Sequence, residues 1–315
     1  MSRPTAGLIG RRALLGGLVA APVVLQFGLA RAAGAYLFPL GVASGDPAPD
    51  GFVIWTRLAA DPFAADGQGG LSGTIETRWE VAADEGFRRI VAAGDVQADP
   101  RAAHAVHVEV SGLKAGRPYW YRFTAGGQQS PTGLSRTTPA PGAHVDRLRL
   151  AVASCSNWEA GYFSAYGHMA AEAPDLTLFL GDYIYEYSVT GERAAKAVRR
   201  YGLEEATTLA GYRNRYALHR TDADLQRLHA AAPCLAVWDD HEVLNNYSGV
   251  WSDKGGDPRA FLQRRSAAYQ AFYEAMPIRR TRLDEWGRMP IHKRVRYGRL
   301  AEFFMLDGRQ YRSRG

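Results

Sequence analysis

Three short apolar stretches of this 315-residue sequence each end in side chains that can bind a metal ion. A run of four or five apolar residues is typical of a strand buried on both faces of a parallel sheet. Parallel strands end at the same edge, and open α/β sheets bind their ligands just outside it. The sequence therefore predicts one site at the ends of three strands. The stretches and their following residues are Leu148–Ala153 with Ser154–Asn157, Leu176–Leu180 with Gly181 and Asp182, and Cys234–Trp238 with Asp239–Glu242.

The residue types after these strands favour a mixed metal centre. Asp182 and Asp240 offer hard oxygen ligands, and Cys155 offers a soft thiolate. Tyr185 follows Asp182 by three residues, close enough for a phenolate oxygen to reach the same ion. Thiolate and phenolate together favour a strongly Lewis-acidic ion such as ferric iron, whereas the amide oxygens of Asn245–Asn246 suit calcium. Two metals bridged by one carboxylate can clamp a phosphate and activate water.

Other interpretations of these residues remain open. Cys155 could act as a nucleophile with His241 as its base. Cysteine phosphatases, however, hold the phosphate with an arginine six positions after the nucleophile, and this sequence has Gly161 there. Cys155 could also be a buried thiol at a strand end. Asp182 could be a simple turn residue, although the nearby acids of Asp239–Glu242 repel one another unless a cation neutralises them.

The elements that position these side chains follow from apolar periodicity. Tyr162–Ala173 has helical spacing between two of the strands, which predicts a βαβ unit. Glu204–Ala232 and Phe261–Met276 are predicted to be helical. Arg299–Leu306 is predicted to be a fourth strand, which ends in the polar residues Asp307–Arg309. Because a parallel strand needs helical cover on both faces, we expect the complete protein to continue beyond this sequence.

The first half of the chain has a different pattern. Residues 36–140 are predicted to be all-β, because short apolar stretches alternate with Gly, Pro and Asp clusters. Tyr119, Tyr121 and Phe123 alternate along one stretch, as a strand with one inward face requires. The turn before it resembles the tyrosine corner of fibronectin type III sandwiches. We therefore expect a β-sandwich domain, joined by a Pro- and Gly-rich linker to a second domain over residues 146–315.

Residues 1–32 have the pattern of an export signal. Arginines precede an apolar segment, and Ala30–Ala32 supplies a small-x-small cleavage pattern. The Arg11–Arg12 pair resembles a twin-arginine signal, with an ordinary secretory signal as the alternative. Glycine and proline interrupt the apolar segment, so we expect no stable membrane anchor. The sequence predicts a bacterial protein that is exported to the periplasm or secreted, with the twin-arginine machinery as a partner.

The charge distribution argues against a nucleic-acid partner, and the cysteine positions argue against a disulfide. Residues 1–32 contain four arginines and no acid, which accounts for four of the six formal positive charges, so we expect no specific nucleic-acid partner. The basic stretch Arg279–Arg299 is interpreted as a solvated face, with an anion-attracting rim as the alternative. Cys155 and Cys234 are predicted to stay free, because at that strand register their sulfurs lie on the order of 15 Å apart.

Six motifs stand out along the chain: Ala43–Pro47, Ile54–Arg57, Ala153–Ser156, Leu180–Tyr185, Trp238–Asn246 and Leu306–Arg312. These motifs resemble those of the alkaline phosphatase D (PhoD) family. They appear in the family's order from about Tyr36 to the end of the sequence. The resemblance implies an α+β multi-domain fold, with a fibronectin III-like β-sandwich before a metallophosphoesterase-like αββα domain that is incomplete at its C-terminus.

The same resemblance implies a centre of one iron (Fe³⁺) and two calcium (Ca²⁺) ions. Cys155 and Tyr185 match iron ligands, and Asp182 matches the carboxylate that bridges iron and calcium. Asp240 and Asn246 match calcium ligands, with the preceding residue of each pair as the alternative register.

Further residues and the activity follow from the resemblance as well. His241 is expected to contact the phosphate or to support the metal ligands, and Arg309 is expected either to contact the phosphate or to be structural. The implied activity is hydrolysis of phosphate monoesters or diesters by a metal-activated oxygen nucleophile. The family's last motif, of Gly-Asp-x-His type, has no match after Asp182, so the sequence is expected to be truncated relative to the family. The alternatives are an inactive fragment and a non-catalytic extracytoplasmic binding module.

Overall fold

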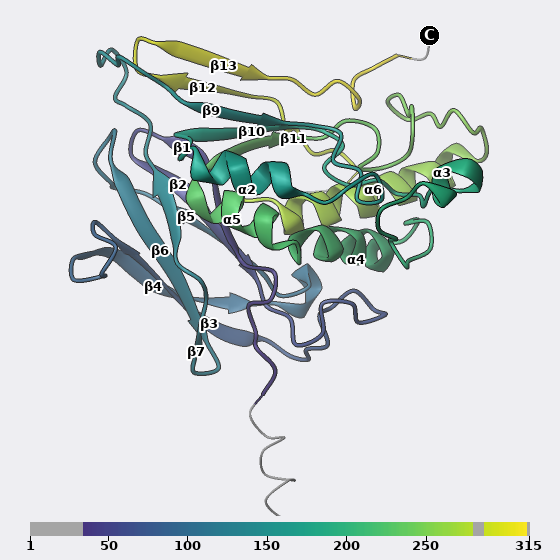
Figure 1. The fold of residues 1–315 in the computed structure, drawn as a ribbon, viewed down its shortest axis with the longest axis horizontal. Coiled ribbons are helices and arrows are strands. Elements are labelled where there is room, and N and C mark those ends of the chain that lie inside the picture. The colour runs from purple at the N-terminus through teal and green to yellow at the C-terminus, as the bar shows by residue number, and fades with distance from the viewer. Residues whose placement is uncertain (1–33, 280–286, 314–315) are drawn as a thin grey trace, which may run out of the picture. The chain divides into compact units, whose positions relative to one another are not determined.

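The computed structural model describes residues 34–279 and 287–313, so the predicted export signal over residues 1–32 lies outside the described residues. Several sheets and helices give a mixed α+β fold, as predicted (Figure 1). The strands are β1 Val42–Ala48, β2 Gly51–Arg57, β3 Ile75–Ala82, β4 Ile90–Ala98, β5 Ala105–Val110, β6 Pro118–Ala125, β7 Gln128–Gln129, β8 Gly133–Arg136, β9 Leu150–Ala153, β10 Leu176–Leu180, β11 Cys234–Val237, β12 Lys293–Tyr297 and β13 Ala301–Met305. The helices are α2 Ser164–Ala171, α3 Gly191–Ala195, α4 Leu209–Arg220, α5 Ala223–Ala231 and α6 Pro258–Ala275, with a 3₁₀ turn at Pro100–Ala102.

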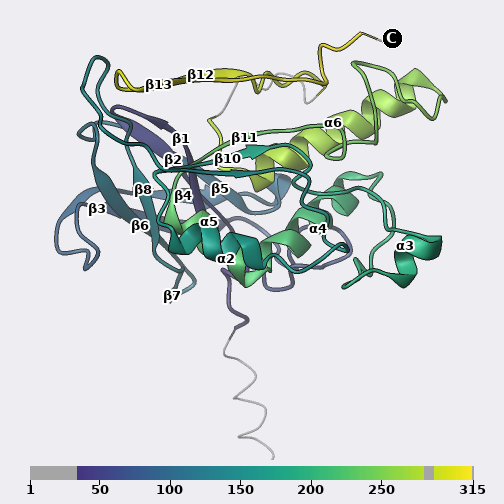
Figure 2. The ribbon, with the colours of Figure 1, turned by 45° about the horizontal axis from the view of Figure 1, so that its top comes forward.

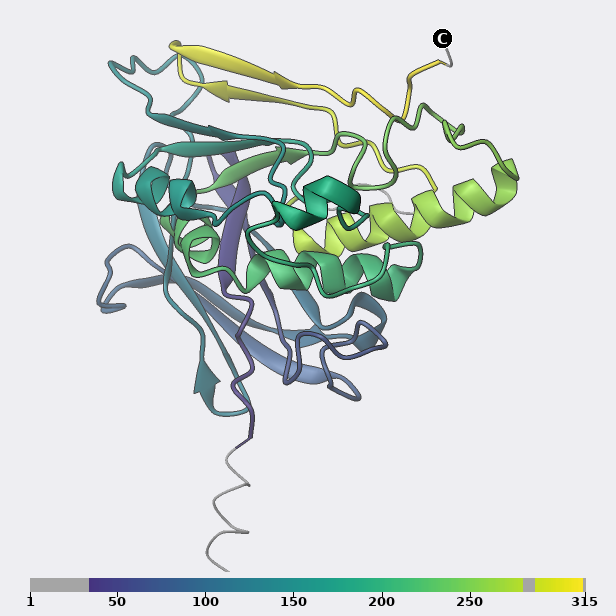
Figure 3. The same ribbon diagram turned by 45° about the vertical axis from the view of Figure 1, so that its right-hand side comes forward.

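A six-stranded mixed sheet carries the strands that were predicted to hold the site. Its order is β5-β2-β1-β11-β10-β9. Strands β9, β10 and β11 are mutually parallel, and α2 connects β9 to β10, which confirms the predicted βαβ unit. Their carboxyl ends therefore lie at one edge, as Figure 3 shows.

The sheet also joins the two halves of the chain. Strand β1 pairs with β11 in parallel through Gly45 and Cys234. Strand β2 is buried on both faces, and its side chains alternate between two environments. Phe52 and Ile54 belong to an apolar cluster with residues of β3 and β6, whereas Trp55 donates its indole N–H to the carbonyl oxygen of Glu274 in α6. Strands from the first half thus pack against both a second sheet and the helices of the second half.

That second sheet is antiparallel and carries the predicted tyrosine pattern. Its order is β4-β3-β6-β7, with β8 also paired to β6. Tyr121 and Phe123 are fully buried on β6, which confirms the predicted inward face. The hydroxyl of Tyr119 accepts a hydrogen bond from the N–H of Lys114 at 2.9 Å, as a tyrosine corner requires. The comparison of this region with a fibronectin type III domain stays a prediction.

Helices cover one face of strands β9–β11, and the β12–β13 hairpin lies on the opposite side (Figure 2). Residues 204–232 are predicted to be helical, but the structure has two helices there, α4 and α5. The side chain of Asp222 accepts hydrogen bonds from the N–H groups of Asp224 and Leu225, which starts α5 as a new helix. In the described residues, no helix has both the length and the apolar character needed to cross a membrane.

The predicted fourth strand within Arg299–Leu306 is confirmed as β13, but the expectation that it is a parallel strand is wrong. Within this segment, β13 pairs antiparallel with β12 in a two-stranded hairpin. Gly298 begins the turn with φ +55°, and a Cβ there would lie 2.7 Å from the carbonyl oxygen of Ala143. An apolar stretch has the same composition in a hairpin and in a parallel sheet, so the residue types alone did not separate the two.

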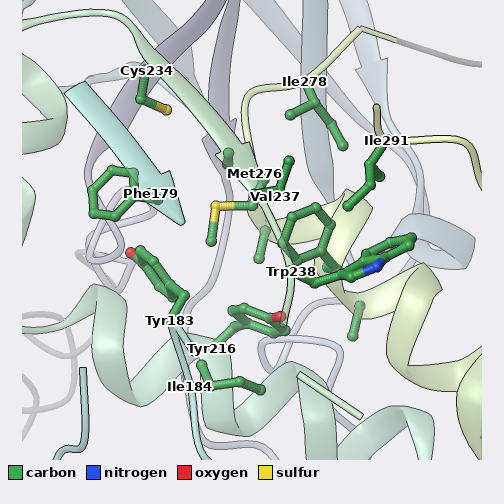
Figure 4. Close-up of a cluster of buried hydrophobic side chains, with 14 of the residues drawn as sticks. Phe179, Tyr183, Ile184, Tyr216, Cys234, Val237, Trp238, Met276, Ile278 and Ile291 are labelled. Carbon is green, nitrogen blue, oxygen red and sulfur yellow. The ribbon is translucent and has the colours of Figure 1, made fainter. Parts of the chain in front are cut away.

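An apolar core supports the strand ends that carry the site. Figure 4 shows Val237 and Trp238 beside Met276 and Ile278, and the indole of Trp238 stacks on Tyr269 with ring centroids 4.0 Å apart. Cys234 is buried in this core, Cys155 is exposed, and both are free, as predicted. A packed core directly beneath the strand ends fixes the starting points of the loops that follow.

Candidate metal centre

The loops after β10 and β11 approach each other so closely that only glycine fits at one position. Gly181 has φ +102°, and a Cβ built there would lie 2.5 Å from both the N and the Cβ of Asp239. Asp182 follows with φ +51°, a left-handed conformation that non-glycine residues rarely adopt. Backbone strain of this kind is concentrated at functional sites. The local fold therefore holds the side chain of Asp182 beside the β11 loop.

Asp182 is the common contact of the other predicted iron ligands. The thiol of Cys155 donates to Oδ2 of Asp182 at 3.5 Å, and the hydroxyl of Tyr185 donates to the same oxygen at 3.3 Å. The other oxygen, Oδ1, accepts a hydrogen bond from the N–H of His241 at 3.3 Å. Side chains from the β9 and β10 loops thus converge on one buried carboxylate.

Asp240 also lies beside Asp182. The ligand atoms of Asp182, Asp240 and His241 lie within 4.8 Å of one another, and all three residues are buried. Oδ2 of Asp240 accepts a hydrogen bond from the N–H of Asn246 at 2.5 Å. Asp239 points elsewhere, because its Oδ1 lies 2.5 Å from Nε of Arg309. Of the two neighbouring aspartates, Asp240 is the one beside Asp182.

The remaining predicted residues lie around this cluster. Asn245 and Asn246 have exposed side chains, so their amide oxygens are accessible to an ion, while their main-chain N–H groups donate to Glu186 and Asp240. Arg309 is half-buried, and its guanidinium also lies 3.3 Å from Oδ1 of Asp240. The guanidinium therefore pairs with the acids of the β11 loop.

The site concentrates negative charge that water does not fully solvate. Burial, and then the charges of Asp240 and Asp239, raise the pKa of Asp182, although His241 opposes this shift. Burial also raises the pKa of the Cys155 thiol and that of the Tyr185 hydroxyl, and the charge of Asp182 adds to both shifts. Burial raises the pKa of Asp240 too, but the Asn246 N–H, His241 and Arg309 lower it overall.

Sequence reasoning missed two buried glutamates beside these residues. Oε2 of Glu186 lies 2.8 Å from Nδ1 of His241, and its Oε1 accepts the N–H of Asn245 at 2.9 Å. Burial alone would lower the pKa of His241, but the carboxylates of Glu186, Asp182 and Asp240 raise it overall. The signal in the sequence was an acid inside the aromatic stretch Tyr183–Tyr187, where a solvated side chain is not expected.

The second is Glu242, which belongs to the acidic run Asp239–Glu242 after the third predicted strand but was given no role of its own. Its Oε2 accepts the N–H groups of Asp182 at 3.1 Å and Asp239 at 2.8 Å, and its Oε1 accepts that of Tyr183 at 2.6 Å. Burial and the charge of Asp182 raise its pKa to about 8, against the three N–H donors that lower it. One carboxylate thus joins the backbones of both loops.

These residues fit a bound cation. Two buried carboxylates and a histidine have ligand atoms within 4.8 Å of one another, and burial together with the neighbouring acids raises the pKa of Asp182. A cation at this point would offset that repulsion. Carboxylate, thiol and phenol groups together suit a harder transition metal, and carboxylate and amide oxygens suit calcium.

The chain is similar to known phosphatases over nearly all of its length. The sequence profile described as PhoD-like phosphatase matches residues 150–315, and that of the PhoD-like phosphatase N-terminal domain matches residues 23–139. Alkaline phosphatase D of Bacillus subtilis (strain 168) is 50% identical over 279 residues, which cover 88% of this chain and 47% of that protein. A solved structure of PhoD superposes with a TM-score of 0.83 and 49% identity, covering 89% of this chain and 53% of that one. The chain therefore spans about half the length of these relatives.

Proposed function

The chain belongs to the PhoD-like phosphatase family, and on that premise we propose that it hydrolyses phosphate esters at a metal centre built around Asp182. The observation that carries this proposal is the buried cluster of Asp182, Asp240 and His241, with ligand atoms within 4.8 Å of one another. The cluster lies where an α/β sheet binds its ligands, at the carboxyl ends of parallel strands. Both monoesters and diesters are in the proposed substrate class.

Two groups of side chains would hold the metals. Cys155, Tyr185 and Asp182 would hold Fe³⁺, supported by the two contacts to Oδ2 of Asp182 at 3.5 and 3.3 Å. Asp182, Asp240 and Asn246 would hold Ca²⁺. Bound metals of this charge neutralise the phosphate oxygens and lower the pKa of water.

His241 and Arg309 would organise the rest of the site. His241 lies beside both aspartates, where its ring can exchange a hydrogen bond with a phosphate oxygen. Arg309 would keep Asp239 away from the centre and hold Asp240 in place, because it pairs with both carboxylates. A direct contact between Arg309 and phosphate stays a prediction.

The proposal extends to the domains and the location of the protein. Residues 1–32 would be a twin-arginine export signal, residues 36–140 a fibronectin III-like β-sandwich domain, and residues 146–315 the catalytic metallophosphoesterase-like domain. The protein would then act in the periplasm or outside the cell. Export in a folded state suits a protein that must acquire iron before crossing the membrane.

The test is metal content and phosphatase activity in the same preparation. The chain is purified with iron and calcium supplied, dialysed, and assayed by elemental analysis and with p-nitrophenyl phosphate and its diester. We expect retained iron and calcium together with hydrolysis. Asp182→Asn should lose metal and roughly 100-fold or more of kcat/KM, because Asp182 is the carboxylate that would hold both ions. The exposed Asp253→Asn is the matched control and should change neither.

The opposite result favours the other candidate. A folded chain that holds no metal after dialysis and hydrolyses neither ester would contradict the proposal and favour a binding module. Asp182→Asn with wild-type metal content and rate would contradict the role assigned to Asp182.

A further inference from the structure

Glu186 is fully buried and links the two loops of the site through its side chain. It follows β10 in the chain, whereas both of its partners, His241 and Asn245, follow β11. One carboxylate oxygen lies 2.8 Å from Nδ1 of His241, and the other accepts the N–H of Asn245 at 2.9 Å. Each oxygen therefore has its own partner in the opposite loop.

The backbone at Glu186 is held independently of this carboxylate. Its carbonyl oxygen accepts the N–H of Ala206 at 2.7 Å and a guanidinium N–H of Arg215 at 3.1 Å. Arg215 is itself fully buried and also donates to the carbonyl oxygen of Glu204. Because these contacts fix where the side chain starts, a change confined to the carboxylate should leave the loop in place.

The ring of His241 is confined on more than one side. It packs on Tyr185, with ring centroids 4.2 Å apart, and on Tyr187 at 5.4 Å. Its main-chain N–H is bonded to Asp182 at 3.3 Å. Since Glu186 engages Nδ1, the ring nitrogen left for a ligand is Nε2.

We propose that Glu186 is a positioning residue that acts through His241. Its carboxylate accepts the Nδ1–H group, which fixes the ring plane and assigns the proton to Nδ1. Nε2 is then the nitrogen that faces the phosphate ester, as an acceptor in the neutral ring and as a donor to a phosphate oxygen when the ring gains a second proton. This proposal rests on the proposed function, because it assigns a role in binding or turnover of the same substrate. A carboxylate that orients a histidine in this way is a common device in catalytic sites.

Replacement by glutamine tests the assignment with little change in shape. A glutamine has one acceptor oxygen, and the N–H of Asn245 can only donate. That oxygen must therefore serve Asn245, which turns the amide NH₂ toward Nδ1 of His241. Nδ1 must then accept, and the proton moves to Nε2. Glu186→Gln should thus reverse the tautomer of His241 and leave the backbone unchanged.

The first measurement is the tautomer, which requires no activity. ¹⁵N-histidine NMR is recorded on the full chain treated with a chelator, at rising pH until the His241 signals stop changing and the ring is neutral. The signals of His241 are assigned by their loss in His241→Asn. We expect protonated Nδ1 in the wild type and protonated Nε2 in Glu186→Gln. The exposed Glu192→Gln is the matched control and should give the wild-type spectrum.

The second measurement is a double-mutant cycle on kcat/KM. Glu186→Gln should lower it by roughly 10–100-fold, with unchanged metal content, as measured for residues that orient a catalytic or metal-binding histidine. Combined with His241→Asn, it should add nothing further, because its effect passes through the ring. A purely structural role would instead multiply the two losses. If Glu186→Gln fails to fold, Glu186→Asp is used, which keeps the carboxylate and should keep the Nδ1–H tautomer.

The outcomes separate this proposal from the proposed function. A wild-type ring protonated on Nε2 would overturn the role of Glu186 whether or not the chain hydrolyses esters. Multiplicative losses in the cycle would overturn it as well. Protonated Nδ1 in a chain that hydrolyses no ester would support the positioning of the ring while contradicting the proposed phosphatase activity.

Discussion

The loops that follow β10 and β11 are joined by two buried carboxylates. Ser154–Asn157, the start of the β9 loop, is held mainly by neutral groups, whereas the side chains of Glu159 and Arg199 support the residues beyond it. Glu242 of the β11 loop accepts the N–H groups of Asp182 and Tyr183, and Glu186 of the β10 loop contacts His241 and accepts the N–H of Asn245. Each loop therefore contributes one glutamate whose side chain bonds to the other loop.

The β9 loop has another kind of support. The N–H of Ser156 donates to the carbonyl oxygen of Asp182 at 2.7 Å, and its hydroxyl contacts that of Tyr166. The carbonyl oxygen of Ser156 lies 3.3 Å from Nε2 of His219, a buried and neutral ring. The side chain of Cys155 is exposed.

This difference separates two tasks. The glutamates that join the β10 and β11 loops fix the backbone beside Asp182 and Asp240. Burial and the charge of Asp182 raise the pKa of Glu242 to about 8, so the positions of the two loops and the charge at the site depend on the same groups. The neutral contacts at the start of the β9 loop place its backbone, and Cys155 stays accessible. Four predictions test whether the carboxylate contacts and the neutral contacts behave differently. They run from the largest expected effect to the smallest.

Removal of Glu242 should cost the most. Glu242→Ala leaves three buried N–H groups without their acceptor, so the free energy of unfolding should fall by roughly 3–5 kcal/mol. Urea denaturation of the metal-free protein measures this loss. The control is Glu205→Ala, which removes an exposed carboxylate paired with Arg264 and should cost about 1 kcal/mol or less. Equal losses in the two variants would contradict the special role of the buried carboxylate.

The β9 loop should weaken in acid through His219. Burial lowers the pKa of His219 to about 4, below the ordinary value of 6.5. Because the unfolded chain binds the proton more readily, His219 contributes stability above pH 6.5 that is lost as the pH falls toward 4, about 3 kcal/mol in all. The stability difference between wild type and His219→Gln should shrink over this range. A constant difference would show that the ring does not titrate there.

Replacement of Arg309 tests the charge balance of the β10 and β11 loops, which the two buried carboxylates join. Arg309→Gln removes the cation beside Asp239 and Asp240, which should destabilise the metal-free protein by roughly 1–2 kcal/mol. Saturating calcium should reduce this loss, because a bound cation restores the charge balance. The control is Arg294→Gln on β12, whose exposed pair with Glu302 should give a smaller loss that calcium leaves unchanged. A calcium-independent loss at Arg309 would contradict the shared role.

Much of this arrangement could be predicted from the sequence, because short-range patterns determine it. Buried apolar strands and the polar residues after them placed Asp182 and Asp240 at one sheet edge. Pairings between distant segments could not be predicted in this way. The parallel pairing of β1 with β11 has one residue pair in register, Gly45 and Cys234, and nothing local in either strand indicates it. The β13 hairpin was missed because its partner, β12, is rich in lysine and arginine.

The two glutamates show another limit of sequence reasoning. The sequence does not distinguish a buried acid from a solvated one. Only the tertiary structure shows which N–H groups surround a given carboxylate. Glu186 and Glu242 were therefore passed over in favour of residues with a familiar ligand chemistry. The aspartates could be predicted because they follow strands directly, whereas the residues that orient them act across loops.

Replacement of Cys155, the exposed side chain of the β9 loop, should have the smallest effect on stability. Its side chain is exposed and makes a 3.5 Å contact to Asp182, so Cys155→Ala should change the free energy of unfolding by about 0.5 kcal/mol or less.

The same thiol should nevertheless report metal binding. Because burial and Asp182 raise its pKa, iodoacetamide should label Cys155 slowly at neutral pH in the metal-free protein, and faster as the pH rises above the ordinary thiol value. Iron should protect it, whereas Cys234, which is buried in the core, should stay unlabelled in both forms. Labelling at the same rate with and without iron would mean that the β9 loop takes no part in the metal centre. The metal centre would then be confined to the β10 and β11 loops.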